Sequence, residues 1–248
     1  MTRISVILAL MLASTGTPGG EAQVAVAANF ANPVKRLADE FKRANGHTLA
    51  ISAGSTGKLY AQIRNGAPFD AFLSADDATP LRMEKEKLAK PGSRFTYAVG
   101  RLALWSPTSG RVDDKAEVLR KAAFTRLAIA SPKLAPYGAA AQETMQKLGV
   151  WAALQGKLVY GENIAQTFQF VSSGNADLGF VALSQIQEAG KALAGSHWVV
   201  PPSMHTALRQ DAALLSRGEA NAAASEFLDY LRSAPARELI RGYGYDVP

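Results

Sequence analysis

Short apolar runs alternate with amphipathic segments along the chain from about residue 24 onward. Residues 24–27 form an uninterrupted apolar run, which is typical of a buried strand. The next segment carries apolar residues at helical spacing, at Val34, Leu37, Ala38 and Phe41. Asn32-Pro33 suits the start of this helix and Asn45-Gly46 its end, because proline lacks an N–H that the first turn does not need and glycine tolerates the left-handed conformation.

The same alternation continues to the carboxyl end. It predicts further strands over 49–52, 71–74, 96–105, 127–130, 158–160, 178–181, 198–200 and 210–215. It predicts helices over 58–65, 115–122, 138–148, 165–172, 184–189, 220–233 and 235–242. Strands that alternate with helices favour an α/β protein with parallel sheets covered on both faces.

Nothing in the sequence reads as a flexible linker between domains. Strand-like stretches cross the two natural break regions, near 98–100 and near 201–205. We therefore expect two α/β lobes joined by two strand-like crossings, with the second lobe inserted into the first. Lobe I is predicted to contain residues 23–98 and 204–248, and lobe II residues 99–203.

The amino terminus has the pattern of a secretory signal peptide. Arg3 is followed by the apolar run 4–13, and Pro18-Gly19-Gly20 breaks that run. Gly20 and Ala22 put small residues at the two positions that a signal peptidase reads, which predicts a signal peptide over 1–22 and cleavage before Gln23. A buried helix or a membrane anchor is the alternative, but the apolar run is short for an anchor. We expect a periplasmic protein.

Composition removes several classes of site. The 248 residues include no cysteine, so disulfides, thiolate metal sites and cysteine nucleophiles are absent. The formal net charge is +6, but lysine and arginine are interspersed with acids, as in 35–43 and 82–87. Such mixed runs are typical of solvated helix faces, and we expect no nucleic-acid partner.

Four turns share one pattern that suits anion binding. Each joins a strand end directly to a helix start through small or polar residues, at 28–33, 54–58, 136–139 and 162–165. The first N–H groups of a helix lack partners within it, and the helix dipole adds partial positive charge there. Any one such turn is more often only a helix cap. The run Ser55-Thr56-Gly57-Lys58 stands out because flanking glycines let the backbone approach a ligand, although P-loop spacing is absent.

Signals for an enzyme are weaker. His47, His197 and His205 have no metal-ligand spacing, and no Gly-x-Ser-x-Gly elbow occurs. Asp76-Asp77 is interpreted as a loop and helix cap rather than a metal or acid site. We expect no enzyme and no cation ligands, while an exported serine hydrolase remains an open alternative that needs a histidine near Ser55.

Several longer stretches carry a family resemblance. They are Gly66-Ala67-Pro68-Phe69-Asp70 with Ser74-Ala75-Asp76, and residues 26–30, 52–63, 135–138, 176–183 and 195–198. On these residues the chain resembles the periplasmic molybdate-binding proteins of ABC transporters, over essentially the whole chain after residue 22.

The resemblance implies a type II periplasmic-binding-protein fold, with a cleft between two hinged lobes. It implies a monomer that captures molybdate and tungstate without a cofactor and delivers the oxyanion to a membrane permease. Matched to the family's motifs, the anion contacts fall on Asn29, Thr56, Tyr137 and Ile164, with Ser55 beside them. Molybdenum is then bound as the oxyanion through these residues.

This chain departs from the family's pattern at two positions. Ala28 stands where many relatives have a hydroxyl, so that donor is either missing or replaced by the Asn29 amide. Ala182 stands where some relatives have a tyrosine. Sulfate or another oxyanion is the alternative ligand. An organic acid is disfavoured because no arginine lies in the four turns.

Overall fold

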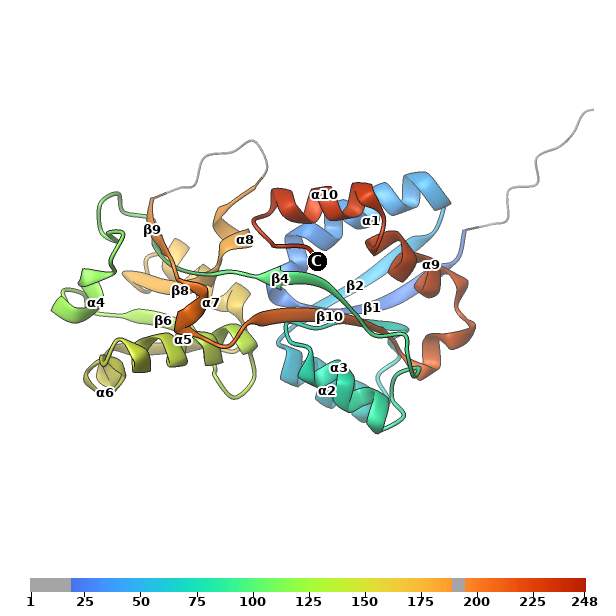
Figure 1. Cartoon of the computed structure of the whole chain (residues 1–248), viewed down its shortest axis with the longest axis horizontal. Coiled ribbons are helices and arrows are strands. Elements are labelled where there is room, and N and C mark those ends of the chain that lie inside the picture. Colours follow the sequence, from blue (N-terminus) through green and yellow to red (C-terminus); the bar gives the residue numbers. More distant parts are fainter. Residues whose placement is uncertain (1–18, 189–194) are drawn as a thin grey trace, which may run out of the picture.

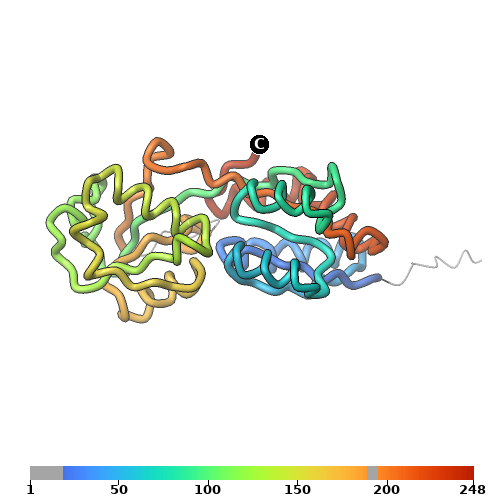
Figure 2. Tube along the Cα trace, turned by 90° about the horizontal axis from the view of Figure 1, so that it is seen from below, coloured from blue at the N-terminus to red at the C-terminus, as the bar shows by residue number. Residues whose placement is uncertain are grey.

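The computed structural model describes residues 19–188 and 195–248, which form two α/β lobes side by side (Figures 1 and 2). Residues 1–18 of the signal peptide predicted over 1–22, and residue 189 of the helix predicted over 184–189, lie outside the described residues. Within these ranges, no helix combines the length and the apolar character needed to cross a bilayer.

The first lobe is built on a five-stranded mixed sheet of order β2-β1-β3-β10-β4. Its strands are β1 (Glu21–Ala27), β2 (Thr48–Gly54), β3 (Ala71–Leu73), β4 (Phe95–Gly100) and β10 (Leu208–Leu214). Strand β1 pairs in parallel with β2 and β3, whereas β10 runs antiparallel to β3 and β4.

Helices cover both faces of this sheet because successive side chains of a strand point to opposite faces. Val24 and Val26 of β1 pack in one apolar cluster with α1 (Ala31–Asn45), α9 (Ala222–Leu231) and α10 (Ala234–Gly242). Ala25 packs on the other side with α2 (Thr56–Arg64) and α3 (Ala78–Lys85). Figure 1 shows these two helices on the opposite side of the sheet from α1, α9 and α10. Two 3-10 turns complete the lobe, η1 (Ala28–Phe30) before α1 and η4 (Ser216–Ala220) before α9.

The second lobe repeats this plan with a sheet of order β7-β6-β8-β5-β9. Its strands are β5 (Leu102–Ser106), β6 (Leu127–Ala130), β7 (Leu158–Gly161), β8 (Leu178–Ala182) and β9 (Ser196–Val199). One face packs on α4 (Glu117–Lys121), α5 (Pro136–Lys147) and α6 (Trp151–Leu154), and the other on α7 (Ile164–Ser172) and α8 (Leu183–Ile186). The turn η2 (Gln155–Lys157) lies between α6 and β7 in the chain, and η3 (Pro202–Met204) lies between β9 and β10, with Met204 packed against the apolar cluster that contains α5.

Two features of the predicted topology are wrong. The sheets are not parallel throughout, because β10 and β5 each run antiparallel to their neighbours. The predicted strand over 96–105 is two strands in different sheets, separated by the exposed Arg101. Apolar periodicity indicates which residues are extended and buried, but it does not indicate which strand pairs with them or in which direction that strand runs.

The chain passes between the lobes twice. The first crossing is the single residue Arg101 between β4 and β5, and the second runs from 200 to 207 through η3.

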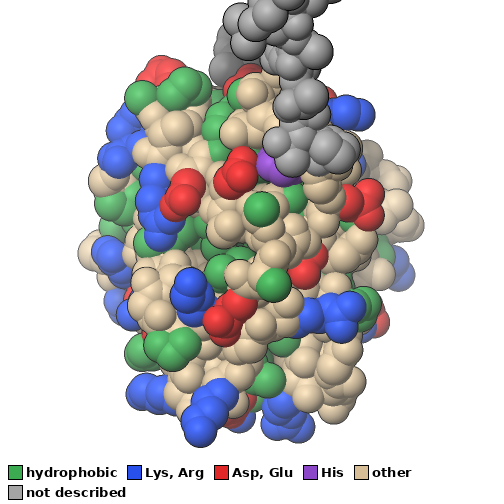
Figure 3. Space-filling view, turned by 90° about the vertical axis from the view of Figure 1, so that its right-hand side faces the viewer, with side chains coloured by type: hydrophobic (Ala, Val, Ile, Leu, Met, Phe, Trp, Pro, Cys, Tyr) green, Lys and Arg blue, Asp and Glu red, His purple; other side chains and the backbone are tan. Residues whose placement is uncertain are grey.

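Charged side chains of both signs are interspersed on the end of the first lobe seen in Figure 3, as the mixed charge runs predict.

Candidate functional site

The four turns singled out in the sequence meet at one small cavity between the lobes. Its volume is about 10 Å³. The lobe I wall consists of Ala27, Ala28, Asn29, Gly54, Ser55, Thr56 and Ala75, and the lobe II wall of Ala135, Pro136, Tyr137, Asn163 and Ile164. All five residues predicted for the site line this cavity, and none of the lining residues is charged.

Helix starts surround the cavity on both sides. Helix α2 begins at Thr56, α5 at Pro136 and α7 at Ile164, while α1 follows η1, which contains Asn29. Each helix start carries partial positive charge from the aligned peptide dipoles. Their convergence makes the cavity favourable for an anion although no lysine or arginine lines it.

The first turn of α2 leaves one N–H group for a ligand. Ser55 caps the helix, since its Oγ accepts from the Lys58 N–H at 3.4 Å. The Gly57 N–H donates across the cleft to the Leu134 carbonyl at 3.0 Å. The Thr56 N–H lies between these two and has no hydrogen-bond partner among the described residues.

Helix α7 follows the same scheme. Asn163 caps it with its side-chain oxygen, which accepts from the N–H groups of Ala165 and Gln166 at 3.0 Å each. That cap leaves the N–H of Ile164 unpaired within the described parts of the chain.

Helix α5 reaches the same result by another route. Pro136 has no N–H, while Gly138 and Ala139 both donate to the Ala135 carbonyl. The N–H of Tyr137 is left, and that of Asn29 in η1 likewise has no partner in residues 19–188 and 195–248. The N–H groups of Asn29, Thr56, Tyr137 and Ile164 are thus all unpaired within the described residues, and all four residues line one cavity.

The Thr56 hydroxyl is held in a defined role. Its Oγ1 accepts from the Ala75 N–H at 3.1 Å, and the residue is only 2% exposed. A hydroxyl has one hydrogen to donate. Because the Ala75 bond uses an acceptor position, that hydrogen remains available to a ligand in the cavity.

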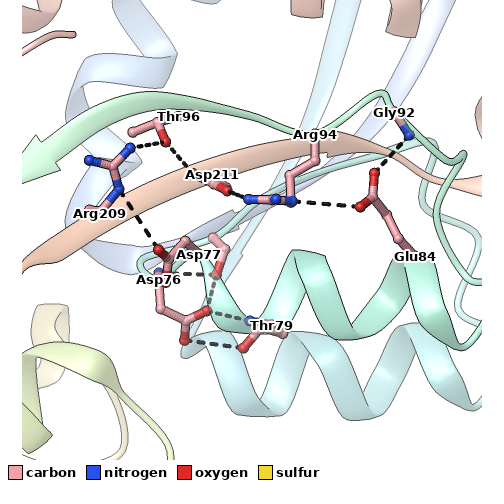
Figure 4. A network of polar contacts seen from close by, with 10 residues as sticks. Asp76, Asp77, Thr79, Glu84, Gly92, Arg94, Thr96, Arg209 and Asp211 are labelled. Carbon is pink, nitrogen blue, oxygen red and sulfur yellow. Dashed lines mark hydrogen bonds and ion pairs between the residues drawn. The ribbon is translucent and has the colours of Figure 1, made fainter.

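A polar network behind the cavity fixes the loop that carries Ala75 (Figure 4). The Asp76 carboxylate accepts from the Thr79 N–H at 2.8 Å and from the Ser74 hydroxyl at 3.2 Å. The Asp76 carboxylate thus pairs an N–H of the first turn of α3, one residue before the N-cap residue Asp77, and burial raises the pKa of Asp76. The Ser74 N–H donates to the main-chain oxygen of Asp211 at 2.9 Å, which ties the loop to β10.

The side chain of Asp211 is also held by polar contacts. Its side chain is 0% exposed and pairs with Arg94, and Thr96 donates to it at 2.7 Å. These bonds hold β4 and β10 together next to the loop that carries Asp76 (Figure 4).

Asn29 directs its side-chain amide away from the cavity, so of the two alternatives at Ala28 the structure favours the one in which the hydroxyl donor is missing and not replaced. Both interactions of its Nδ2 are inside the protein, with Gln210 Oε1 at 2.8 Å and Tyr245 Oη at 3.0 Å. Only the main chain of Asn29 is left to bind a ligand. Ala182 does not line the cavity, and its N–H donates to Gln185 Oε1 at 2.9 Å.

Further polar contacts close the two lobes on each other at the cavity's edge. Lys58 of α2 pairs with Glu162, beside α7, at 2.7 Å, next to the cross-cleft bond from Gly57. Asn29, Thr56, Tyr137 and Ile164 are each at most 3% exposed. A ligand in this arrangement is removed from bulk water, which strengthens every hydrogen bond to it.

The serine hydrolase alternative has no geometric support. None of the three histidines lines the cavity. His47 accepts from the Gly20 N–H and contacts Glu226, and His205 contacts the Thr206 carbonyl. In the described parts of the chain, no group of three or more carboxylates and histidines is arranged to hold a metal ion.

Three residues behind the site were missed by sequence reasoning. Gln185 donates to the Ile164 carbonyl at 3.0 Å, and Gln210 and Tyr245 both bond to Asn29. Gln210 and Tyr245 lie 181 and 216 positions from Asn29, and no local pattern marks them.

Comparison with known proteins places this cavity in a family context. The family model for bacterial extracellular solute-binding proteins matches residues 22–246. The molybdate-binding protein ModA of Azotobacter vinelandii is 51% identical over all of this chain and 98% of its own length. ModA of Rhodobacter capsulatus is 48% identical over 98% of this chain and 94% of its own.

A solved structure gives the same result for the fold. The periplasmic molybdate-binding protein of Azotobacter vinelandii superimposes with a TM-score of 0.89 at 38% identity, covering 92% of this chain and 99% of that one. The expected type II periplasmic-binding-protein fold, with two lobes and a central cleft, is confirmed. The family match, the full-length relatives and the two-lobed fold together show that this chain belongs to the bacterial extracellular solute-binding proteins.

Proposed function

We propose that this protein is a periplasmic receptor that captures molybdate in the cavity between its lobes and supplies it to an ABC transporter. The observation that carries the proposal is the set of four unpaired N–H groups, from Asn29, Thr56, Tyr137 and Ile164, around a cavity without charged side chains. Relatives about half identical over their full length are named as molybdate-binding proteins. Family members of this kind are solute receptors and not enzymes.

In the proposed complex, each lobe contributes two N–H donors to the tetrahedral oxyanion. The Thr56 hydroxyl adds a fifth donor, and the neighbouring Ser55 hydroxyl, whose oxygen caps α2, is a sixth candidate. An ionised oxyanion has only acceptors, so a cavity that presents donors matches it on every oxygen. A protonated oxyanion needs an acceptor for its own hydrogen, which a lining of N–H groups does not supply.

Because the donors come from both lobes, the anion itself stabilises the closed arrangement. We propose that the two lobes move relative to each other about the crossings at Arg101 and 200–207. The lobe boundaries expected from the sequence, 23–98 with 204–248 and 99–203, fall two residues before the end of β4 and within the second crossing. The closed protein, as a monomer, is then the form that delivers its ligand to the membrane permease. Tungstate, a tetrahedral dianion of the same charge, is proposed as a second ligand.

Export through a signal peptide over 1–22 is part of the same proposal. Cleavage before Gln23 removes Glu21 and Ala22 from β1, where they pair with Thr48 and Leu49 and where Ala22 is fully buried. The mass of the protein recovered from the periplasm decides between cleavage at this bond and cleavage earlier in the chain.

Calorimetric titration of the mature protein with molybdate, tungstate and sulfate in parallel tests the proposed ligand. We expect binding heat with molybdate and tungstate, and sulfate that does not displace molybdate in competition. Absence of heat with both larger anions refutes the function, and sulfate binding as tight as molybdate binding favours the alternative receptor.

A further inference from the structure

A buried polar network lies behind the anion cavity, on the side of the interlobe crossings. Its side chains are those of Asn29, Tyr97, Tyr137, Ser184, Gln210 and Tyr245, and none is more than 5% exposed. Tyr137 and Ser184 belong to the second lobe and the other four to the first. Buried polar groups of this kind specify one arrangement because each unpaired atom is costly.

Gln210 of β10 is the centre of the network. Its Oε1 accepts from Asn29 Nδ2 at 2.8 Å and from the Tyr97 hydroxyl at 3.0 Å. Its Nε2 donates to the Tyr137 hydroxyl at 3.1 Å. One side chain therefore connects a cavity residue of the first lobe with a cavity residue of the second.

Tyr245, near the end of the chain, makes the second connection. Its hydroxyl lies 3.0 Å from Asn29 Nδ2, 2.9 Å from the Asn29 carbonyl oxygen and 2.9 Å from Ser184 Oγ. Ser184 also donates to the Asn29 carbonyl at 3.0 Å. Asn29 is thus held through its side chain and through its carbonyl.

The cavity and the network use opposite ends of the same two residues. Asn29 and Tyr137 line the cavity and have unpaired N–H groups, while their side chains end in the network. Fixing these side chains fixes the direction of the N–H groups, because each residue is clamped from behind.

Gly100 shows how closely the network is packed against the first interlobe crossing. A Cβ atom at this position would lie 2.1 Å from the Tyr137 hydroxyl oxygen and 2.5 Å from Gln210 Nε2. No side chain fits there, and β4 ends at this glycine, directly before Arg101. The network therefore lies where the orientation of one lobe relative to the other is set.

We propose that Gln210 and Tyr245 are positioning residues for the bound anion. They hold Asn29 and Tyr137 so that N–H groups from both lobes face the cavity at the spacing of one oxyanion, and neither touches the anion itself. This inference rests on the proposed molybdate function.

The test compares Tyr245→Phe and Gln210→Met with the unchanged protein in molybdate calorimetry. Tyr245→Phe removes one oxygen atom and keeps the ring, which packs edge-to-face on Phe30. We expect the dissociation constant for molybdate to rise about tenfold in each variant. This is the effect of losing roughly one hydrogen bond between the protein and the anion when an N–H donor is no longer held in place. Tyr230→Phe is the matched control, since its hydroxyl bonds Glu40 away from the cavity, and its affinity should not change.

Two further measurements separate positioning from general stability. Thermal unfolding without molybdate reports structural loss, and amide hydrogen exchange reports whether the Asn29 and Tyr137 N–H groups become mobile in the folded protein. We expect faster exchange at these two amides together with weaker binding at a temperature where each variant is fully folded. If Gln210→Met does not fold, Tyr245→Phe alone decides.

Wild-type affinity in a folded Tyr245→Phe variant overturns the proposal, as does a lowered unfolding temperature with unchanged affinity and exchange. If the unchanged protein binds no oxyanion, the proposed function fails and this proposal fails with it. If the unchanged protein binds and the variants bind equally well, the function stands and only the positioning role is lost.

Discussion

Removal of the Thr56 hydroxyl is the most direct test of how the anion is held. Thr56→Ala deletes a side-chain donor whose oxygen is held in place by a bond from the Ala75 N–H. Thr56→Ser is the matched control because it keeps the hydroxyl and removes only a methyl group. The main-chain N–H of residue 56 is present in all three proteins.

The expected magnitude follows from the charge of the ligand. A hydrogen bond to a charged group contributes roughly 1.5–3 kcal/mol, and each 1.4 kcal/mol is a factor of about ten in affinity. We therefore expect Thr56→Ala to raise the dissociation constant for molybdate about ten- to hundredfold. The Ala75 N–H also loses its acceptor, which costs about 1–3 kcal/mol of folding stability but is the same with and without ligand.

Competition calorimetry measures the affinity, and urea unfolding of the ligand-free protein measures the separate cost at Ala75. Thr56→Ser should remain within a few-fold of the unchanged protein in both assays. Equal molybdate affinity in all three proteins refutes the reasoning, because it means that the hydroxyl does not donate to the anion.

Three other perturbations test separate parts of the site. The cross-cleft ion pair of Lys58 and Glu162 is about half exposed, and such pairs contribute little because water and salt screen them. Lys58→Met should therefore change molybdate affinity by less than about fivefold, and only at low salt. A large loss of affinity that persists in high salt contradicts the assignment of this pair as a weak surface interaction. Asp211→Asn should lower the free energy of unfolding by the low end of roughly 3–5 kcal/mol, because it leaves the partly exposed Arg94 without its buried partner, and urea titration measures this. Burial holds the pKa of Asp76 above 3.8, so the folded protein binds this proton more tightly than the unfolded chain does, and stability should rise as the pH falls through the raised pKa. Asp76→Asn keeps the side-chain oxygen that accepts from Thr79 but cannot titrate. The free energy of unfolding of this variant should therefore lack the increase that the unchanged protein gains from Asp76 between neutral pH and a pH just above 3.8.

Local sequence chemistry marks the four turns, and the family resemblance selects the candidate site residues within them. A proline at the start of α5 and the caps Ser55 and Asn163 are short-range signals, and each determines which N–H groups of its helix are already bonded. The order of strands and helices likewise predicts two α/β lobes, because periodicity reports burial of each element. The four turns are local features that the sequence predicts, whereas their convergence at one cavity depends on the tertiary structure.

Tertiary structure alone decided how those turns are used. The predicted strand over 96–105 divides between two sheets at Arg101, and β10 enters its sheet antiparallel, since strand pairing depends on distant segments. The side-chain amide of Asn29 points away from the cavity because it donates to Gln210 and Tyr245, which lie far along the chain. Sequence determined which backbone groups are free to bind an anion, and packing between remote segments determined where they point, because a side-chain direction is set by whichever partner the fold brings within hydrogen-bond distance.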